Sequence, residues 1–327
     1  MKAVTLTILL ILYLCVGVVW YILAKKDALK KKNSNLEVNS IDGTIENGEV
    51  VVNSENVAQL DKVNKKTAIF NILLYFILFN ILVSVVSSIG IVIYLKVNGI
   101  EYDLINPNSS VFDENVYNKM VVCLNPIIEI IIYGLAAIGI GLISKNILKE
   151  AFNGYTKKNF QFSLACVGFI LVAGFVSSFI FTLFDINTSS SNQDAIEEMM
   201  FSSSIGLTIT VIVTCILAPL VEELVFRKSI FDLIKDTNLA ILISALLFGF
   251  LHVSSSSFSA LTNMIRGEGN YLDFINELIQ IIPYSLMGFT ICYFYSLSKK
   301  NIATTIVAHA MYNTLSLILS IISYRLS

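Results

Sequence analysis

Residues 218–227 read APLVEELVFR, so two adjacent glutamates and an arginine stand at the end of a long apolar run. That run, residues 201–221, otherwise holds little but aliphatic and small hydroxyl residues. Ionisable side chains are costly inside an apolar span, so each one marks a candidate functional position. The stretch therefore points both to a membrane protein and to a polar site within it.

The chain as a whole is also strongly apolar. Its 327 residues are 55% hydrophobic and 14% charged and have a mean hydropathy of +0.75, whereas soluble domains average roughly 45–50% apolar and ~25% charged. A spanning helix needs about 20 mostly apolar residues. We predict an all-α, polytopic transmembrane helix bundle of about eight spans, at residues 3–24, 68–96, 119–144, 162–184, 203–222, 238–255, 275–297 and 301–323.

Positive charge is distributed in alternate loops. Lysine and arginine gather after the first, third, fifth and seventh runs, whereas the loops between them are acidic or neutral. The positive-inside rule makes the basic loops cytoplasmic, so both ends of the chain face outward. We therefore expect an integral, multi-pass protein of a bacterial cytoplasmic membrane.

Two further segments are interpreted as structural. The first run lacks a small-residue cleavage site and is followed by lysines, which indicates an uncleaved anchor. Residues 27–66 are polar and are predicted to form a mostly disordered linker, although TIENGEVVVN at residues 44–53 contains a hairpin signal. The five cysteines fall one per apolar run without a CxxC pair, which favours packing roles over a disulfide framework or a zinc site.

The ionisable residues of the later spans are two glutamates and the only two histidines of the chain. Glu223 and Arg227 are four residues apart, a spacing that favours an ion pair on a helix. Glu222 points about 100° away from Glu223 on such a helix and has no such partner. His252 and His309 lie in apolar runs, and histidine suits proton transfer near neutral pH.

These groups have overlapping depths in the membrane, so we expect one intramembrane cavity that opens toward the cytoplasmic side. Glu222, shielded from water, could act as a base and share a water molecule with His252. His309 and Asn313 lie one helical turn apart and could stabilise an oxyanion. The set predicts peptide-bond hydrolysis without a covalent intermediate.

Two alternatives bear on these residues. Glu223 and Arg227 could be a purely structural ion pair. Two histidines and a glutamate could also supply three zinc ligands, but HExxH is absent and no further carboxylate stands out near either histidine. We expect no cofactor and keep a zinc-dependent membrane protease as an alternative.

Three motifs resemble those of a family of membrane-embedded endopeptidases, which includes the CAAX prenyl proteases and the bacteriocin-processing or abortive-infection (CPBP, Abi) proteins. They are EExxxR at 222–227, FxxxH at Phe248 and His252, and HxxxN at His309 and Asn313. The resemblance covers about residues 201–320, and Gly288 also fits it. Lys228 departs from the glycine that is common there, which bears on local packing.

The resemblance implies a glutamate-dependent intramembrane protease. Glu222 would be the general base with His252 sharing its water, His309 and Asn313 the oxyanion site, and Glu223 a supporting carboxylate oriented by Arg227. It implies three parts: residues 1–66, an anchor helix and polar linker; 67–184, accessory transmembrane helices; and 185–327, the catalytic membrane core. The expected substrate is a peptide or membrane protein, with or without a lipid, cleaved near its terminus as in CAAX processing, bacteriocin maturation or self-immunity.

Two other classes of function are weighed against this one. A non-enzymatic immunity or scaffold protein could use the buried polar residues to bind a partner. A proton-coupled transporter could use them as a relay, but no inverted repeat supports that function. No basic surface interleaved with aromatic residues appears, so nucleic-acid binding is not expected.

Overall fold

The computed structural model describes residues 54–326 and the isolated positions 11, 19, 22, 25 and 26. This part of the chain is helical and contains seven helices long and apolar enough to cross a membrane. The predicted all-α polytopic bundle is thus confirmed, whereas the predicted span at residues 3–24 lies outside the described residues. The seven spans are Asn64–Asn98, Glu114–Ile143, Lys157–Leu183, Ser204–Leu233, Thr237–Arg266, Tyr271–Leu297 and Ile302–Leu326.

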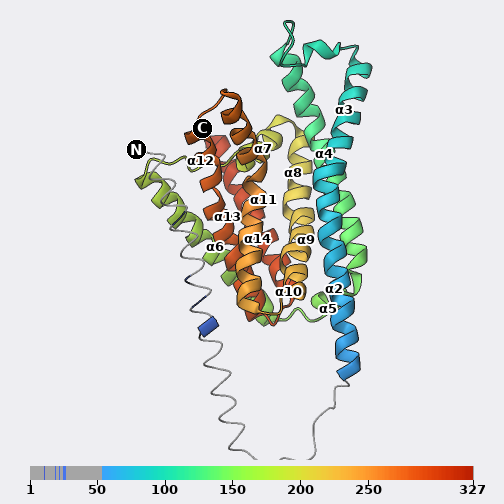
Figure 1. Ribbon diagram of the computed structural model, residues 1–327, viewed down its shortest axis with the longest axis vertical. Helices are drawn as coiled ribbons and strands as arrows, with labels where there is room; N and C mark the ends of the chain where they lie inside the picture. Colours follow the sequence, from blue (N-terminus) through green and yellow to red (C-terminus); the bar gives the residue numbers. More distant parts are fainter. Residues whose placement is uncertain (1–10, 12–18, 20–21, 23–24, 27–53, 327) are drawn as a thin grey trace, which may run out of the picture.

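The spans form one bundle, in which α2 to α4 stand on one side and α6, α11, α13 and α14 on the other, with α8 and α9 between them (Figure 1). The helices are α2 Ser54–Phe76, α3 Val83–Asn98, α4 Glu114–Ile143, α5 Lys145–Asn153, α6 Lys157–Leu183, α7 Ser191–Ser202, α8 Ser204–Ile212, α9 Ala218–Glu222, α10 Ile230–Leu233, α11 Thr237–Arg266, α12 Tyr271–Ile279, α13 Ile281–Leu297 and α14 Ile302–Leu326. Between them lie the π-helical turns η1 Ile77–Leu82, η3 Val213–Leu217 and η4 Glu223–Ser229, and the 3-10 turn η2 Tyr102–Leu104.

Several predicted boundaries differ from the structure, and the span predicted at residues 238–255 is part of α11, which continues to Arg266. The run predicted to end at residue 222 continues as helix to Leu233, because its charged side chains are sheltered inside the bundle. The predicted linker 27–66 is helical from Ser54 onward, since Ser54–Phe76 is free of glycine and proline. The rest of that linker, including the hairpin signal at 44–53, lies outside the described residues.

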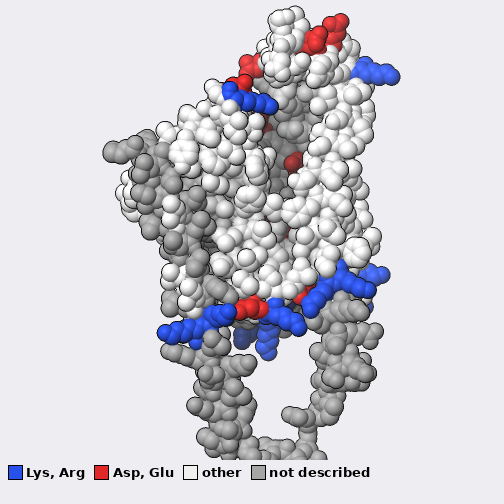
Figure 2. Space-filling model, viewed as in Figure 1, with Lys and Arg blue, Asp and Glu red and all other residues white. Residues whose placement is uncertain are grey.

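The charged residues lie at the two ends of the bundle, and the surface between them is almost uncharged (Figure 2). One end carries a band of lysines from α5, the start of α6 and the α13–α14 connection, which we call the basic end. The α3–α4 connection, α7 and α12 lie at the opposite end, which carries acidic side chains and is called the acidic end. The basic loops and the acidic or neutral loops that alternate in the sequence therefore lie at opposite ends of the bundle.

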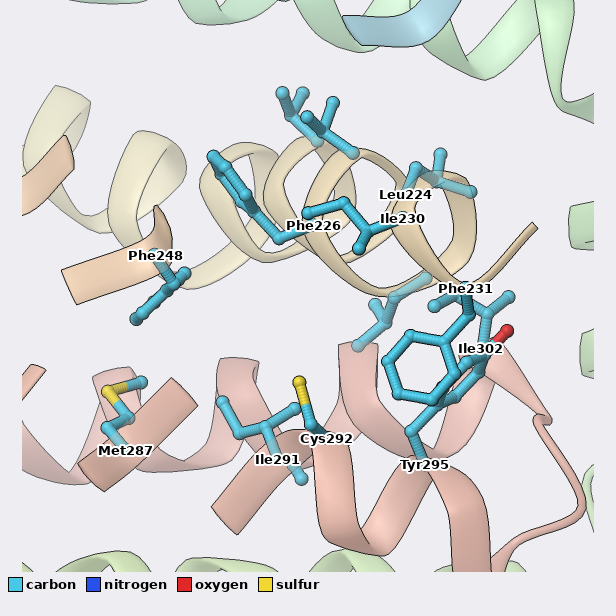
Figure 3. Close-up of a cluster of buried hydrophobic side chains, with 14 of the residues drawn as sticks. Leu224, Phe226, Ile230, Phe231, Phe248, Met287, Ile291, Cys292, Tyr295 and Ile302 are labelled. Carbon is cyan, nitrogen blue, oxygen red and sulfur yellow. The ribbon is translucent and has the colours of Figure 1, made fainter. Parts of the chain in front are cut away.

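The core toward the basic end is closely filled. Side chains of η4 and α10 face those of α13, with the Phe231 ring against the Tyr295 ring at 5.0 Å between centroids (Figure 3). Gly249 of α11 lets α13 approach, because a Cβ there would lie 2.0 Å from Ser285 Oγ and 2.9 Å from the Ile281 carbonyl oxygen. Small residues at such crossings allow membrane helices to pack closely.

Candidate active site

The two glutamates of APLVEELVFR lie where the α-helix changes to a π-helix. Glu222 ends α9 and Glu223 begins η4, so the helix continues past both of them. Arg227 Nε lies 3.2 Å from Glu223 Oε2, which is the ion pair predicted from the spacing. π-helical turns interrupt the regular backbone ladder and are frequent at functional sites.

Arg227 is completely buried, and Phe248, the phenylalanine of the second motif, packs against its guanidinium group. The guanidinium carbon lies 4.2 Å from the centre of the Phe248 ring, a distance typical of a cation–π contact. Phe248 is itself buried, and its ring also lies 4.4 Å from the His252 ring and 5.9 Å from the His309 ring. One aromatic side chain thus separates the cation from the two imidazoles.

Glu223 links Arg227 to His309. His309 Nδ1–H donates a hydrogen bond of 2.9 Å to Glu223 Oε1, while the other carboxylate oxygen faces Arg227. Since a hydrogen bond at one ring nitrogen fixes the role of the other, Nε2 of His309 is the atom left for a ligand. Glu223 thus contacts both Arg227 and His309, so the ion pair lies against a residue of the predicted site.

Glu222 lies between the two imidazoles. Its Oε2 is 4.0 Å from His252 Nε2 and 4.0 Å from His309 Nε2. The His252 ring is held from its other side, where Nδ1–H donates to the Phe248 carbonyl oxygen at 2.8 Å. Glu222 is 4% exposed, and its Oε2 finds no hydrogen-bond partner in the described part of the chain.

Asn313 lies one turn beyond His309 on α14, as the sequence predicts, but its amide is partly occupied. Asn313 Nδ2 donates a 2.8 Å hydrogen bond to the Thr214 carbonyl oxygen in η3. The amide keeps one further hydrogen for another acceptor. Asn313 still lines the same cavity as Glu222 and both histidines.

Tyrosine and glutamate side chains from outside the three motifs complete the site. Tyr133 of α4 donates a 3.3 Å hydrogen bond to Glu222 Oε1, and Tyr284 of α13 stacks on His252 at 4.6 Å between ring centres. Glu129, four residues before Tyr133, lines the same cavity. Sequence reasoning missed all three, although the rule that marks ionisable residues inside spans applies to Glu129; no comparable signal marked the tyrosines.

The cavity has a volume of about 700 Å³ and extends from Glu222 to α7 at the acidic end. Thr188, Ser190 and Gln193 line it there, and no residue of the lysine-rich connections does. Figure 2 shows the surface hollowed toward that end, with acidic atoms inside the hollow. The sequence predicted a cavity open toward the cytoplasmic side, and that orientation stays a prediction. In the structure the core of Figure 3 fills the basic end, and the cavity extends toward the acidic end.

Within residues 54–326, no group of three or more His, Cys, Asp or Glu side chains has an arrangement that could hold a metal ion. The histidine that lies against Glu223 already uses Nδ1, so only Nε2 could face a metal. The expected absence of a cofactor stays a prediction.

The region that carries the three motifs is similar to a known protein family. Residues 204–315 match the family model described as type II CAAX prenyl endopeptidase Rce1-like, and these residues contain all three motifs. Residues 204–315 are thus similar to the CAAX-protease family. The matched residues run from the start of α8 into α14, so the family region includes Glu222 and both histidines but not Tyr133 or Glu129.

Two relatives extend the similarity beyond that region. A Mycoplasma capricolum subsp. capricolum protein named "Uncharacterized protein" is 28% identical over 257 residues, which cover 72% of this chain and 68% of the relative. A Bacillus subtilis protein named "Putative membrane peptidase YdiL" is 29% identical over 188 residues, which cover 55% of this chain and 66% of the relative. The chain thus spans about two thirds of each relative. No solved structure matches this chain.

Proposed function

We propose that this chain is an intramembrane endopeptidase in which Glu222 activates water without a metal ion. The observation that carries the proposal is the position of Glu222 Oε2, 4.0 Å from the Nε2 atoms of His252 and His309 and without a hydrogen-bond partner in the described chain. A water molecule that donates to this oxygen and to His252 would be held and polarised at one point. The family match and the relative named as a peptidase support peptide hydrolysis.

The reaction begins when the water oxygen attacks the scissile carbonyl carbon and gives one proton to Glu222 Oε2. The carbonyl π electrons move to its oxygen, which becomes an oxyanion. The C–N bond then breaks, and the leaving amine takes that proton from Glu222. Tyr133 donates to the other oxygen, Oε1, so the water-facing Oε2 keeps a fixed direction.

Oxyanion stabilisation falls to His309 and Asn313. When His309 is protonated, Nδ1–H donates to Glu223 and Nε2–H is available to the oxyanion. The remaining amide hydrogen of Asn313 would supply a second donor.

The substrate is proposed to be a peptide or a membrane protein that reaches the site through the cavity within the bilayer. A lipid on the substrate is not required by the geometry, because α4, α7 and α13 all contribute polar cavity residues. The positive-inside pattern supports a bacterial cytoplasmic membrane with the lysine-rich end inside. Processing of CAAX ends, of bacteriocin-like peptides and of peptides for self-immunity all fit this class.

The decisive test compares wild-type protein with Glu222→Gln in detergent, using fluorogenic peptides that include prenylated CAAX and double-glycine leader sequences. Loss of the base should lower cleavage by about 10²–10⁴-fold, while the thermal unfolding temperature stays near that of wild type. Glu150→Gln, an exposed change on α5 at the basic end, serves as the control and should retain activity.

The same assay separates the proposal from its competitors. Cleavage that continues with a zinc chelator present agrees with water activation by Glu222, and cleavage lost to the chelator and restored by zinc would favour a metalloprotease. Equal activity of folded wild-type and Glu222→Gln protein would contradict the assigned base. A biological effect that survives Glu222→Gln would favour a non-enzymatic immunity or scaffold protein.

A further inference from the structure

Glu129 is an ionisable residue in the middle of a membrane span. It lies on α4, halfway along the span Glu114–Ile143, and is half-buried. A charged group at the centre of a span is costly to insert, and such residues usually face a polar cavity. Glu129 forms no ion pair and no hydrogen bond with any residue that the structure describes.

The surroundings of Glu129 lie on the substrate path of the proposed site. Asn125, Glu129 and Tyr133 are spaced by four residues, so they share one face of α4, and all three line the cavity. Tyr133, at the inner end of this row, donates to Glu222 Oε1. Glu129 thus lies about one helical turn, roughly 5–6 Å along the axis, from a tyrosine that contacts the proposed base.

The charge of the cavity is one-sided. Among the described residues that line it, Glu129 and Glu222 are carboxylates, and none is lysine or arginine. Arg227 is already committed to Glu223 and is not part of the lining. Glu222 itself is 4% exposed and leaves Oε2 without a partner, so the cavity contains unmatched acceptors at both positions.

We propose that Glu129 is a substrate-binding residue that pairs with a cationic group of the peptide, either a lysine or arginine side chain or a free α-ammonium, close to the bond cleaved at Glu222. This inference rests on the proposed function and adds a preference for peptides with a cationic group near the cleaved bond. A partly desolvated carboxylate discriminates by charge, because a cation gains a partner there and an anion is repelled. The same cavity disfavours a peptide whose terminal carboxylate must lie beside Glu129.

The test measures binding separately from cleavage. Labelled peptides of one sequence carry lysine, norleucine or glutamate at a chosen position, with the N-terminus acetylated, and a fourth peptide has norleucine and a free N-terminus. Fluorescence anisotropy with Glu222→Gln protein in detergent gives affinities without turnover. The position of the varied residue is scanned over both sides of the central bond, and cleavage by wild-type protein is recorded in parallel.

The expected result is binding of a lysine peptide at least about tenfold tighter than its norleucine partner, with the glutamate peptide weakest. Glu129→Gln in the same background should remove this preference and leave norleucine binding unchanged, while Glu129→Asp should keep part of it. Glu114→Gln, an exposed change in the first turn of α4, should keep all of it. A preference seen only with the free N-terminus assigns the cation to the α-ammonium.

Two results would overturn the inference. One is equal binding of all four peptides at every position, including the peptide with the free N-terminus, and this result needs no Glu129 variant. The other is a lysine preference that persists in folded Glu129→Gln protein. Failure of the proposed function looks different, because wild-type protein would then cleave no peptide whether or not it bound the cationic ones.

Discussion

At the scale of single residues, the site separates two glutamates that are adjacent in the sequence. Glu223 has both oxygens engaged, one by Arg227 and one by His309, whereas Glu222 has one oxygen held by Tyr133 and one facing the imidazoles. Similar side chains with different partners carry out different tasks, because the environment decides which carboxylate can exchange protons. The two residues should therefore respond differently to the same substitution.

Glu223→Gln should mainly lower stability. It removes the negative charge beside Arg227, which is completely buried, and losing one partner of a buried pair costs about 3–5 kcal/mol. Glu222→Gln removes no ion-pair partner of a permanent cation and should change the unfolding temperature little. Thermal unfolding of both variants in one detergent checks this, and an equal loss in both would contradict the different roles.

Tyr133→Phe should lower activity without affecting the fold. The change deletes the hydroxyl that donates to Glu222 Oε1 and leaves the ring packed against Phe79 at 4.7 Å between centres. We expect kcat to fall about tenfold, which corresponds to ~1.4 kcal/mol in the barrier. Tyr117→Phe, on the same helix but outside the cavity lining, is the control. Unchanged kcat in Tyr133→Phe would show that the hydroxyl does not position the base.

At the scale of secondary-structure elements, the position of His252 depends on how closely α11 and α13 pack. Tyr284 of α13 stacks on His252 of α11, and its hydroxyl is within 2.7 Å of Ser190 Oγ just before α7. A change in the distance between the two helices would therefore move the ring that covers the imidazole. Gly249 sets that distance.

Gly249→Ala should destabilise the protein by about 1–3 kcal/mol, the usual range for overpacking. The new methyl group would meet Ser285 Oγ at 2.0 Å, and the Ile281 carbonyl oxygen at 2.9 Å cannot rotate away. Gly168→Ala on α6 is the matched control, since nothing lies within 4 Å of a Cβ there. Unfolding temperatures of the two variants decide the question; equal values would mean that α13 can shift freely.

At the scale of the whole molecule, the lysine-rich connections and the cavity opening lie at opposite ends. If the positive-inside rule holds, the cavity faces the outside of the cell. Ala195→Cys, exposed on α7 in the cavity lining, should react in intact cells with a membrane-impermeant maleimide above the level of the parent protein, and Lys149→Cys should react only after permeabilisation. The reverse pattern would place the opening in the cytoplasm.

The parts of this architecture that the sequence predicted follow from local physical rules. Apolar length identified the spans, and the cost of burying charge identified Glu222, Glu223 and the histidines. The partners of Tyr133 and Asn313 depend on how α4 crosses α9 and on the π-helical turn η3, which no local pattern specifies. The end of the bundle toward which the cavity extends depends on how helices that are distant in the sequence pack together, which no local pattern specifies.

The shelter around the charged turn also bears on how the protein is made. Helix α2 packs against η4, and α4 packs against α9, so the first two described spans cover the turn that carries Glu223 and Arg227. Both spans precede that turn in the chain and leave the ribosome before it. The charged side chains of Glu223 and Arg227, which are costly to insert into a bilayer, thus enter the membrane next to helices that are already there. Shortening this N-terminal part should therefore reduce membrane insertion of the protein before it reduces the activity of the inserted protein.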